Sequence, residues 1–141
     1  MSQEEQKDLR KIVYTAGTWD SFHLGHLRIL QRVRAMSDIM IVGVSTDDLV
    51  EQYKGHKPLD DFSRRFETIC SVSGADIVIP QVRQFDVDRM KRYGVSVVVM
   101  GHDWEGSTKP SLRLLQEHVN VVFLPRTDGI SSSQVRNHLK G

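Results

Sequence analysis

The strongest constraint on the fold of this chain is the alternation of short apolar runs with longer segments of helical character. The apolar runs are rich in β-branched residues and lack strict polar alternation, which is typical of strands buried on both faces. Strands that alternate with helices form parallel sheets through right-handed crossovers. The five runs are residues 11–17, 38–45, 76–80, 95–101 and 119–125.

The segments between the apolar runs carry the helical signals. Apolar residues recur at positions 24, 27, 30 and 33, which predicts a helix that begins at Leu24 and buries one face. Residues 46–60 are polar and contain Gly55 and Pro58, so most of this segment is predicted to be loop. Further helices are predicted from residue 62 onward and over residues 85–94, 111–118 and 131–140.

These elements predict an α/β fold, a single Rossmann-like doubly wound five-stranded parallel sheet with helices on both faces. The length of 141 residues suits one domain with a hydrophobic core of its own. We expect residues 11–141 to form this domain and residues 1–10 to be a flexible leader, because the first ten residues are polar and show no periodicity.

The composition excludes several classes of protein. Nineteen basic and eighteen acidic residues give a formal charge of +1, which argues against a general nucleic-acid binder. A single cysteine, Cys70, excludes an intrachain disulfide. No apolar run approaches the ~20 residues of a membrane span. The charged N-terminus lacks a hydrophobic signal core, so a cytoplasmic protein is expected.

Polar and glycine-rich motifs follow four of the five predicted strands. In open α/β sheets, ligands bind beyond the carboxyl ends of the strands, near the point where the strand order reverses. The third strand ends in PQVRQ, which is less distinctive. The motifs after the other strands read GTWDSFHLGH, STDD, GHDWEG and PRTDGISSS.

The first motif places two histidines at the predicted start of a helix. His23 and His26 are three residues apart, so a helical turn brings both rings to one side, and Gly25 lets a ligand approach the backbone. A helix N-terminus favours an anion, to which imidazoles donate hydrogen bonds. Ordinary cap or core histidines are the alternative. A zinc site has less support, because Cys70 and His102 are distant in sequence and no H-E-x-x-H motif occurs.

The last motif, RTDGISSSQVR, has the character of a second anion site. Three serines, Ser131 to Ser133, open the predicted final helix, and Arg126 lies a few residues upstream. Simple helix capping by serine is the alternative. If both motifs lie at the same edge of the sheet, they are able to bind one polyphosphate together.

A basic segment lies between the two motifs. YKGHKP carries Lys54, His56 and Lys57 on a predicted loop, followed by Arg64 and Arg65 at the start of the next helix. Such a loop is able to close over negative charge that develops in a transition state, although a solvated polar loop is the alternative. Neither a Walker A pattern nor G-x-G-x-x-G after the first strand occurs.

Taken together, these motifs resemble those of the nucleotidyltransferase superfamily. GTWDSFHLGH is similar to G-T-F-D-x-x-H-x-G-H, and GISSSQVR is similar to I-S-[ST]-[ST]-x-[IV]-[RK]. GHDWEG and LPRTDGIS resemble the glycerol-3-phosphate cytidylyltransferase branch, and the similarity covers residues 12 to about 139.

The resemblance implies transfer of CMP from CTP to a small phosphorylated alcohol, most simply glycerol 3-phosphate, with release of pyrophosphate. The acceptor phosphate would attack the α-phosphorus in line, without a covalent enzyme intermediate. Mg²⁺ would be carried by the triphosphate rather than by a protein site. The family is commonly dimeric, so a homodimer is expected.

The resemblance also implies roles for particular residues. Asp20 would order the first loop and lie near the acceptor, with Lys54 and Arg65 as acceptor contacts. The implied catalytic residues are His23, His26, Lys54, Lys57 and Arg126. The implied nucleotide-binding residues are Gly17, Thr18, Trp19, His23, Gly25, His26, Asp103, Arg126, Thr127, Gly129, Ile130, Ser131 and Ser132.

The chain departs from the branch at the residues that would read the acceptor. His102 stands where the branch has aspartate, and the region of the branch's acceptor-binding lysine here reads QFDVD, so that Arg83 or Arg89 would take over its role. An adenylyltransferase of the same fold that uses ATP, and a nucleotide-binding module without catalysis, are the alternatives.

Overall fold

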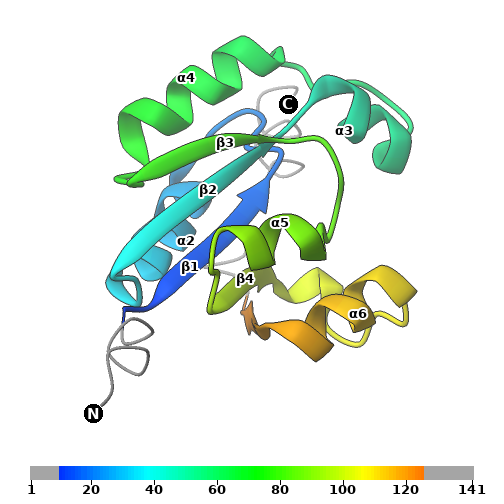
Figure 1. The fold of residues 1–141 in the computed structure, drawn as a ribbon. Helices are drawn as coiled ribbons and strands as arrows, with labels where there is room; N and C mark the ends of the chain where they lie inside the picture. Colours follow the sequence, from blue (N-terminus) through cyan, green and yellow to red (C-terminus); the bar gives the residue numbers. More distant parts are fainter. Residues whose placement is uncertain (1–9, 126–141) are drawn as a thin grey trace.

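A computed structural model describes residues 10–125 and contains a five-stranded, all-parallel sheet (Figure 1). The strand order is β3-β2-β1-β4-β5, which confirms the predicted doubly wound α/β fold. Each strand is matched to a predicted apolar run, with ends that shift by one or two residues. The strands are β1 (Ile12–Gly17), β2 (Ile39–Ser45), β3 (Ile77–Gln81), β4 (Val97–Gly101) and β5 (Asn120–Leu124).

Helices cover both faces of the sheet (Figure 1). One face packs against α2 (Leu24–Ala35) and α4 (Phe62–Val72), and the other against α5 (Val87–Arg92) and α6 (Pro110–His118). The strands therefore have two buried faces, which explains why their sequences lack polar alternation.

Strand β1 shows how consecutive residues divide between the two cores. Val13 contributes to the core beneath α2 and α4, whereas Tyr14 points to the core beneath α5 and α6. The same alternation places Val42 on the first face and Ile41 on the second. Each side of β1 thus packs against a different pair of helices.

The segment 46–60, predicted to be mostly loop, is helical over Asp47–Lys54, slightly more than half of its length, so that prediction is wrong. Helix α3 (Asp47–Lys54) begins after Thr46, whose hydroxyl accepts a hydrogen bond from the Leu49 N–H. It ends at Gly55, which has a left-handed φ of 81°. Only Leu49 and Val50 are buried within α3, so its apolar stripe is too short for periodicity to reveal.

Two other boundaries differ from the predictions. Pro80 lies inside β3 rather than closing it, which is possible because β3 is an edge strand. Helix α5 begins at Val87 rather than at position 85, because Asp86 caps it by accepting a hydrogen bond from the Arg89 N–H. The predicted leader and the predicted helix 131–140 lie essentially outside the described residues.

The strand order reverses between β1 and β4. From β1 the chain proceeds to β2 and β3 on one side, and β4 and β5 lie on the other. Gly17 and Gly101 end the two adjacent strands at this switch point. None of the helices within residues 10–125 has the length and apolar character needed to cross a membrane.

Candidate active site

Two cavities open at the carboxyl ends of β1 and β4, as expected for a switch point. The smaller cavity, of about 280 Å³, extends toward α2 and is lined by Trp19, Asp20 and His26 among others. The larger cavity, of about 440 Å³, extends toward α5 and the end of β3. Residues that line both cavities are Ala16, Gly17, Thr18, Lys54, Met100, Gly101 and Asp103.

The two histidines lie together at the start of α2, as the sequence predicts. Their rings stack with centroids 3.9 Å apart and planes inclined by 21°. His23 Nδ1 accepts a hydrogen bond of 3.0 Å from the Gly25 N–H, and His26 Nδ1 accepts one of 3.2 Å from the His23 N–H. The pair therefore forms a capping box for the helix as well as lining its N-terminal end.

These hydrogen bonds determine where each ring carries its proton. Since both Nδ1 atoms accept, the neutral rings carry their hydrogen on Nε2 and are donors there. Burial lowers the pKa of His23. The pKa of His26 is lowered to about 3, mainly by burial and further by the neighbouring His23 and Lys54, while Asp20 opposes the shift. Both rings are neutral Nε2–H donors at neutral pH.

The loop between β1 and α2 is held in an uncommon conformation. Trp19 and Ser21 have left-handed φ values of 56° and 48°. Trp19 Nε1 donates to the Gly43 carbonyl at 2.9 Å, and the Asp20 carboxylate accepts from the N–H groups of Leu59 and Asp60, each at 2.9 Å. Asp20 thus ties this loop to the segment before α4.

Arg65 is buried rather than open to either cavity. Its side chain is fully buried and donates to the carbonyls of Thr18 and Ser45, to the Asp60 carbonyl and to the Asp47 carboxylate. These acceptors belong to the β1–α2 loop, the end of β2, the segment before α4 and the start of α3. The geometry places Arg65 beneath the site as a link between its loops.

The two predicted lysines are placed differently. Lys54, the last residue of α3, lines both cavities. Lys57 is exposed in the segment after α3 and does not line either cavity. Asp103 lies in the short 3₁₀ helix His102–Trp104 and lines both cavities, with the His102 ring 3.2 Å from its carboxylate. Lys54 and Asp103 are therefore brought to the same opening.

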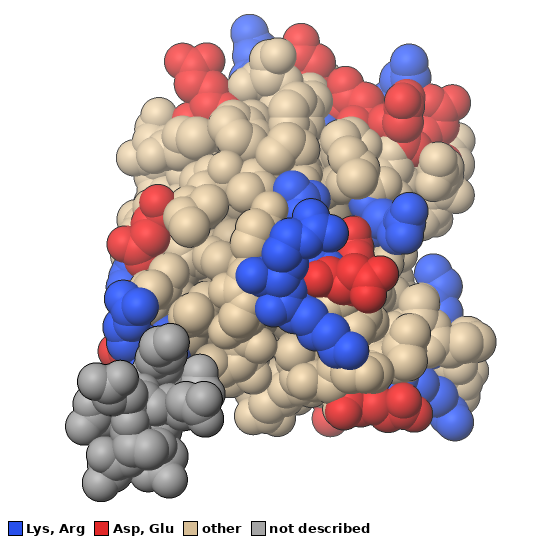
Figure 2. Space-filling view, in the orientation of Figure 1, with Lys and Arg blue, Asp and Glu red and all other residues tan. Residues whose placement is uncertain are grey.

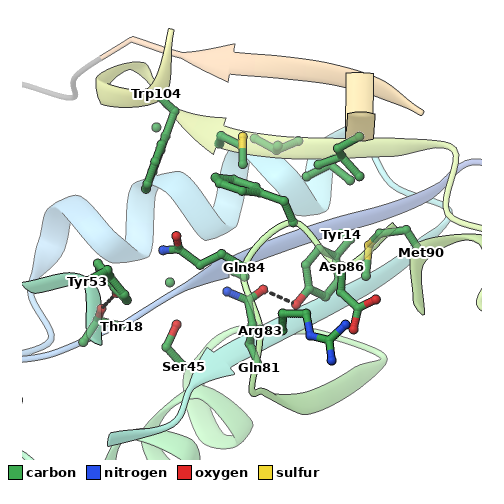
Figure 3. A pocket seen from close by; sticks show the side chains of 18 of the residues that line it. Tyr14, Thr18, Ser45, Tyr53, Gln81, Arg83, Gln84, Asp86, Met90 and Trp104 are labelled. Carbon is green, nitrogen blue, oxygen red and sulfur yellow. Dashed lines mark hydrogen bonds between the residues drawn. The ribbon is translucent and has the colours of Figure 1, made fainter. Parts of the chain in front are cut away.

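The larger cavity contains residues that sequence reasoning missed (Figure 3). Ser45 ends a predicted strand and begins the STDD motif, which was a usable signal, but Tyr53 falls in the segment predicted as loop. Arg83 and Arg89, suggested as replacements for a missing lysine, both line this cavity. Arg89 also donates to the Pro80 carbonyl at 2.7 Å. The missed residues are Tyr14, Ser45, Tyr53, Gln81, Gln84, Phe85 and Trp104.

The face of the molecule drawn in Figure 2 is mixed in charge. Figure 2 shows basic side chains gathered near the middle of the visible face with acidic side chains directly beside them. Within residues 10–125, no group of three histidine, cysteine or acidic side chains is arranged to hold a metal ion. The second motif lies outside the described residues, which applies to Arg126, Thr127, Gly129, Ile130, Ser131 and Ser132.

Comparison with known proteins identifies relatives that match nearly the whole chain. A glycerol-3-phosphate cytidylyltransferase of Staphylococcus aureus (strain NCTC 8325 / PS 47) is 38% identical over 132 residues, covering 93% of this chain and 96% of the relative. The enzyme of the same name from Bacillus subtilis (strain 168) is 34% identical over 136 residues, covering 93% and 98%.

The solved structures agree on the fold. The lipopolysaccharide core biosynthesis protein from Thermoplasma volcanium GSS1 superposes with a TM-score of 0.72 at 20% identity, covering 84% of this chain and 99% of that one. The family model described as cytidylyltransferase-like matches residues 14–138. The chain belongs to the cytidylyltransferase-like family.

Proposed function

We propose that this protein transfers CMP from CTP to glycerol 3-phosphate and releases pyrophosphate. The observation that carries the proposal is the meeting of two cavities at Thr18 and Lys54, at the switch point of the sheet. A reaction between two phosphorylated substrates requires two adjoining pockets that share the point of attack. The relatives named glycerol-3-phosphate cytidylyltransferase, which match nearly their full length, support this choice of substrates.

The smaller cavity is the proposed triphosphate site. His26 lines it, and the start of α2 supplies backbone N–H groups and the positive end of the helix dipole. Because the rings are Nε2–H donors, His23 and His26 donate hydrogen bonds to phosphate oxygens without first taking up a proton. These donors are fixed before the substrate binds, so charge that develops on the leaving pyrophosphate meets a preorganised site.

The acceptor enters from the larger cavity in this proposal. Its phosphate oxygen would approach the α-phosphorus at the shared boundary, where Lys54 and Thr18 lie. Lys54 neutralises charge between the two phosphate groups, which otherwise repel each other. The work of the site is positioning and charge stabilisation rather than covalent catalysis.

Other predicted residues are assigned supporting roles. Arg65, whose hydrogen bonds all go to protein atoms, positions the loops instead of touching the acceptor. Arg126, Thr127, Ser131 and Ser132 would complete the nucleotide site. Lys57 would contribute by movement of its segment, which begins at Gly55, an open position where an added Cβ would meet no atom within 4 Å.

We further infer that Mg²⁺ accompanies the triphosphate. When bound, it would neutralise phosphate charge. The donor set fits an ion held mainly by phosphate and water: Asp103 offers an exposed carboxylate at both cavities, whereas Asp20 already accepts three backbone N–H groups.

The expected homodimer stays a prediction, which light scattering on the purified protein would check.

Pyrophosphate release with purified protein, Mg²⁺, CTP and glycerol 3-phosphate tests the proposed function. We expect CDP-glycerol by mass spectrometry in the same reaction. Replacing CTP by ATP should reduce the rate by more than about 100-fold if the enzyme reads cytosine. Turnover with ATP but not with CTP would favour the adenylyltransferase. Nucleotide binding without turnover of any acceptor would favour a binding module.

A further inference from the structure

The larger cavity has a polar floor that the reaction as proposed does not use. Tyr14 is only 4% exposed, and its hydroxyl donates to Gln81 Oε1 at 2.6 Å. The ring crosses beneath β2 at Gly43, where a Cβ would overlap with the Tyr14 hydroxyl. This hydrogen bond links β1 to the end of β3, across the intervening strand β2. The buried Tyr14 hydroxyl therefore fixes the position of the Gln81 side-chain amide.

The hydrogen bond from Tyr14 fixes which end of the Gln81 amide faces the cavity. Because Oε1 accepts from Tyr14, the amide nitrogen with its two hydrogens points the other way. Figure 3 shows this nitrogen directed away from Tyr14, toward the space near Ser45 and Gln84. Ser45 adds a hydroxyl group to the same cavity, and so does Tyr53, whose hydroxyl is hydrogen-bonded to Thr18 Oγ1 at 2.6 Å. The floor therefore presents neutral donors and acceptors that suit the hydroxyl groups of a ligand.

The two aromatic rings that line the cavity, Phe85 and Trp104, already contact a lysine of the protein. Phe85 and Trp104 form an edge-to-face pair with centroids 5.1 Å apart. Lys109 Nζ lies 5.5 Å from the Trp104 ring centroid and 6.0 Å from that of Phe85. Aromatic faces are the usual receptors for ligand ammonium groups, and here Lys109 competes for them and repels a second cation.

The charged residues on the same side also disfavour a cationic ligand. Three basic residues line the cavity, Lys54, Arg83 and Arg89. They face two acidic residues, Asp103 and Asp86, and the Asp86 carboxylate also caps α5. An acceptor tail that carries an ammonium group would therefore meet more positive than negative charge. An uncharged tail with hydroxyl groups matches both the floor and the walls.

We propose that the larger cavity selects acceptors with an uncharged, polyhydroxylated tail, and that Gln81, oriented by Tyr14, is the specificity-determining residue that reads the tail's hydroxyl groups. This inference rests on the proposed function, since it assigns the acceptor of that same reaction. It assigns acceptor selection to two residues, Tyr14 and Gln81, that lie outside every motif that carried the resemblance.

The first test compares acceptors with the wild-type protein and CTP. Glycerol 3-phosphate and four- and five-carbon polyol phosphates should outperform propyl phosphate by about 100-fold in kcat/KM, because the analogue leaves the Gln81 donors unpaired. Phosphoethanolamine and phosphocholine should be no better than propyl phosphate. A preference for either ammonium acceptor would overturn the inference while leaving cytidylyl transfer in place.

The second test measures whether Gln81 recognises the hydroxyl groups of the acceptor tail. Q81M keeps the length of the side chain and removes its donors, so the preference for glycerol 3-phosphate over propyl phosphate should shrink at least about tenfold while the KM for CTP is unchanged. Y14F should produce a smaller change in the same direction, because the amide loses its fixed orientation. The matched control is Q52M, an exposed glutamine on α3, which should change neither ratio.

The outcomes separate this inference from the proposed function. No pyrophosphate from any acceptor in the wild-type protein would remove the proposed function and this inference with it. Normal turnover with an unchanged acceptor preference in a folded Q81M would overturn this inference alone. If Q81M does not fold, Y14F provides the test, because it removes a single oxygen atom and with it the hydrogen bond that orients Gln81. An unchanged acceptor preference in Y14F then overturns the inference that Gln81, oriented by Tyr14, recognises the tail.

Discussion

Arg65 Nη1 donates a hydrogen bond of 2.7 Å to the carbonyl oxygen of Thr18, a residue 47 positions earlier in the chain. The same nitrogen donates to the Ser45 carbonyl at 2.8 Å, and Nη2 lies 2.6 Å from the Asp47 carboxylate. One buried cation thereby joins the loop that follows β1 to the loop that follows β2. The shape of the junction between the two cavities depends on this link.

Removing the Arg65 guanidinium should therefore damage both stability and activity. R65M leaves the Asp47 carboxylate and three carbonyls without their donor, which should lower the free energy of unfolding by about 3–5 kcal/mol. R65K should keep the charge but lose the forked geometry, so kcat should fall while the protein still folds. Urea denaturation and steady-state kinetics measure the two effects.

Arg64 provides the matched control for this prediction. Its side chain is 77% exposed and makes only a 4.0 Å contact with Asp60. R64M should change the free energy of unfolding by less than about 0.5 kcal/mol. Equal losses in R64M and R65M would contradict the assigned role of the buried guanidinium.

His26 has two functions that one substitution separates. In H26N the shorter amide keeps an acceptor near the Nδ1 position for the His23 N–H but lacks a donor at the position of Nε2. We expect kcat/KM for CTP to fall by about 100-fold or more with little change in Tm. H26A should lose both activity and the helix cap. Wild-type turnover by a folded H26N would contradict donation from Nε2.

Because the pKa of His26 is lowered, the free energy of unfolding should decrease as the pH falls below about 6.5. Above pH of about 6.5 the ring is neutral in both the folded and the unfolded chain, so the folded state carries no penalty. As the pH falls toward about 3, the unfolded chain takes up a proton that the folded chain does not, so stability is lost. One such group contributes a slope of up to about 1.4 kcal/mol per pH unit. Urea midpoints between pH 7 and pH 5 should fall more steeply for the wild type than for H26N; parallel slopes would be the contrary result.

Gly43 and Tyr14 should show coupled effects on stability. A methyl group at position 43 would overlap with the Tyr14 hydroxyl, so G43A should cost about 1–3 kcal/mol. Y14F removes the overlapping oxygen, so the double variant should be more stable than the sum of the two single losses predicts. A double-mutant cycle by thermal denaturation measures this coupling, and strict additivity would contradict it.

The sequence was sufficient for the sheet because β-branched runs such as 38–45 and 95–101 are buried on both faces. It also located the histidine pair, since spacing of three residues at a helix start determines that both rings share one side. These predictions depend on local periodicity and spacing, which a single sequence displays directly.

The acceptor side of the site could not be predicted in the same way. Tyr14 is indistinguishable from a core residue within an apolar strand, and its partner Gln81 follows a strand end that carries no motif. Their relationship exists only because β2 lies between β1 and β3, and strand order is a tertiary property. Helix α3 was missed for a related reason, since its two buried residues are too few to produce a periodic pattern.

Pro80 has a consequence for how this protein can associate with other chains. Gln81 uses its carbonyl toward β2, by accepting from the Thr46 N–H, so the backbone of Pro80 faces the open side of β3, where its carbonyl accepts from Arg89. Pro80 has no backbone N–H, and its carbonyl already accepts a hydrogen bond from Arg89. An added strand therefore has no backbone donor or open acceptor to pair with at Pro80. Oligomers that form by adding strands to β3 are therefore disfavoured beside Gln81, so the acceptor side of the larger cavity is not covered by strand addition.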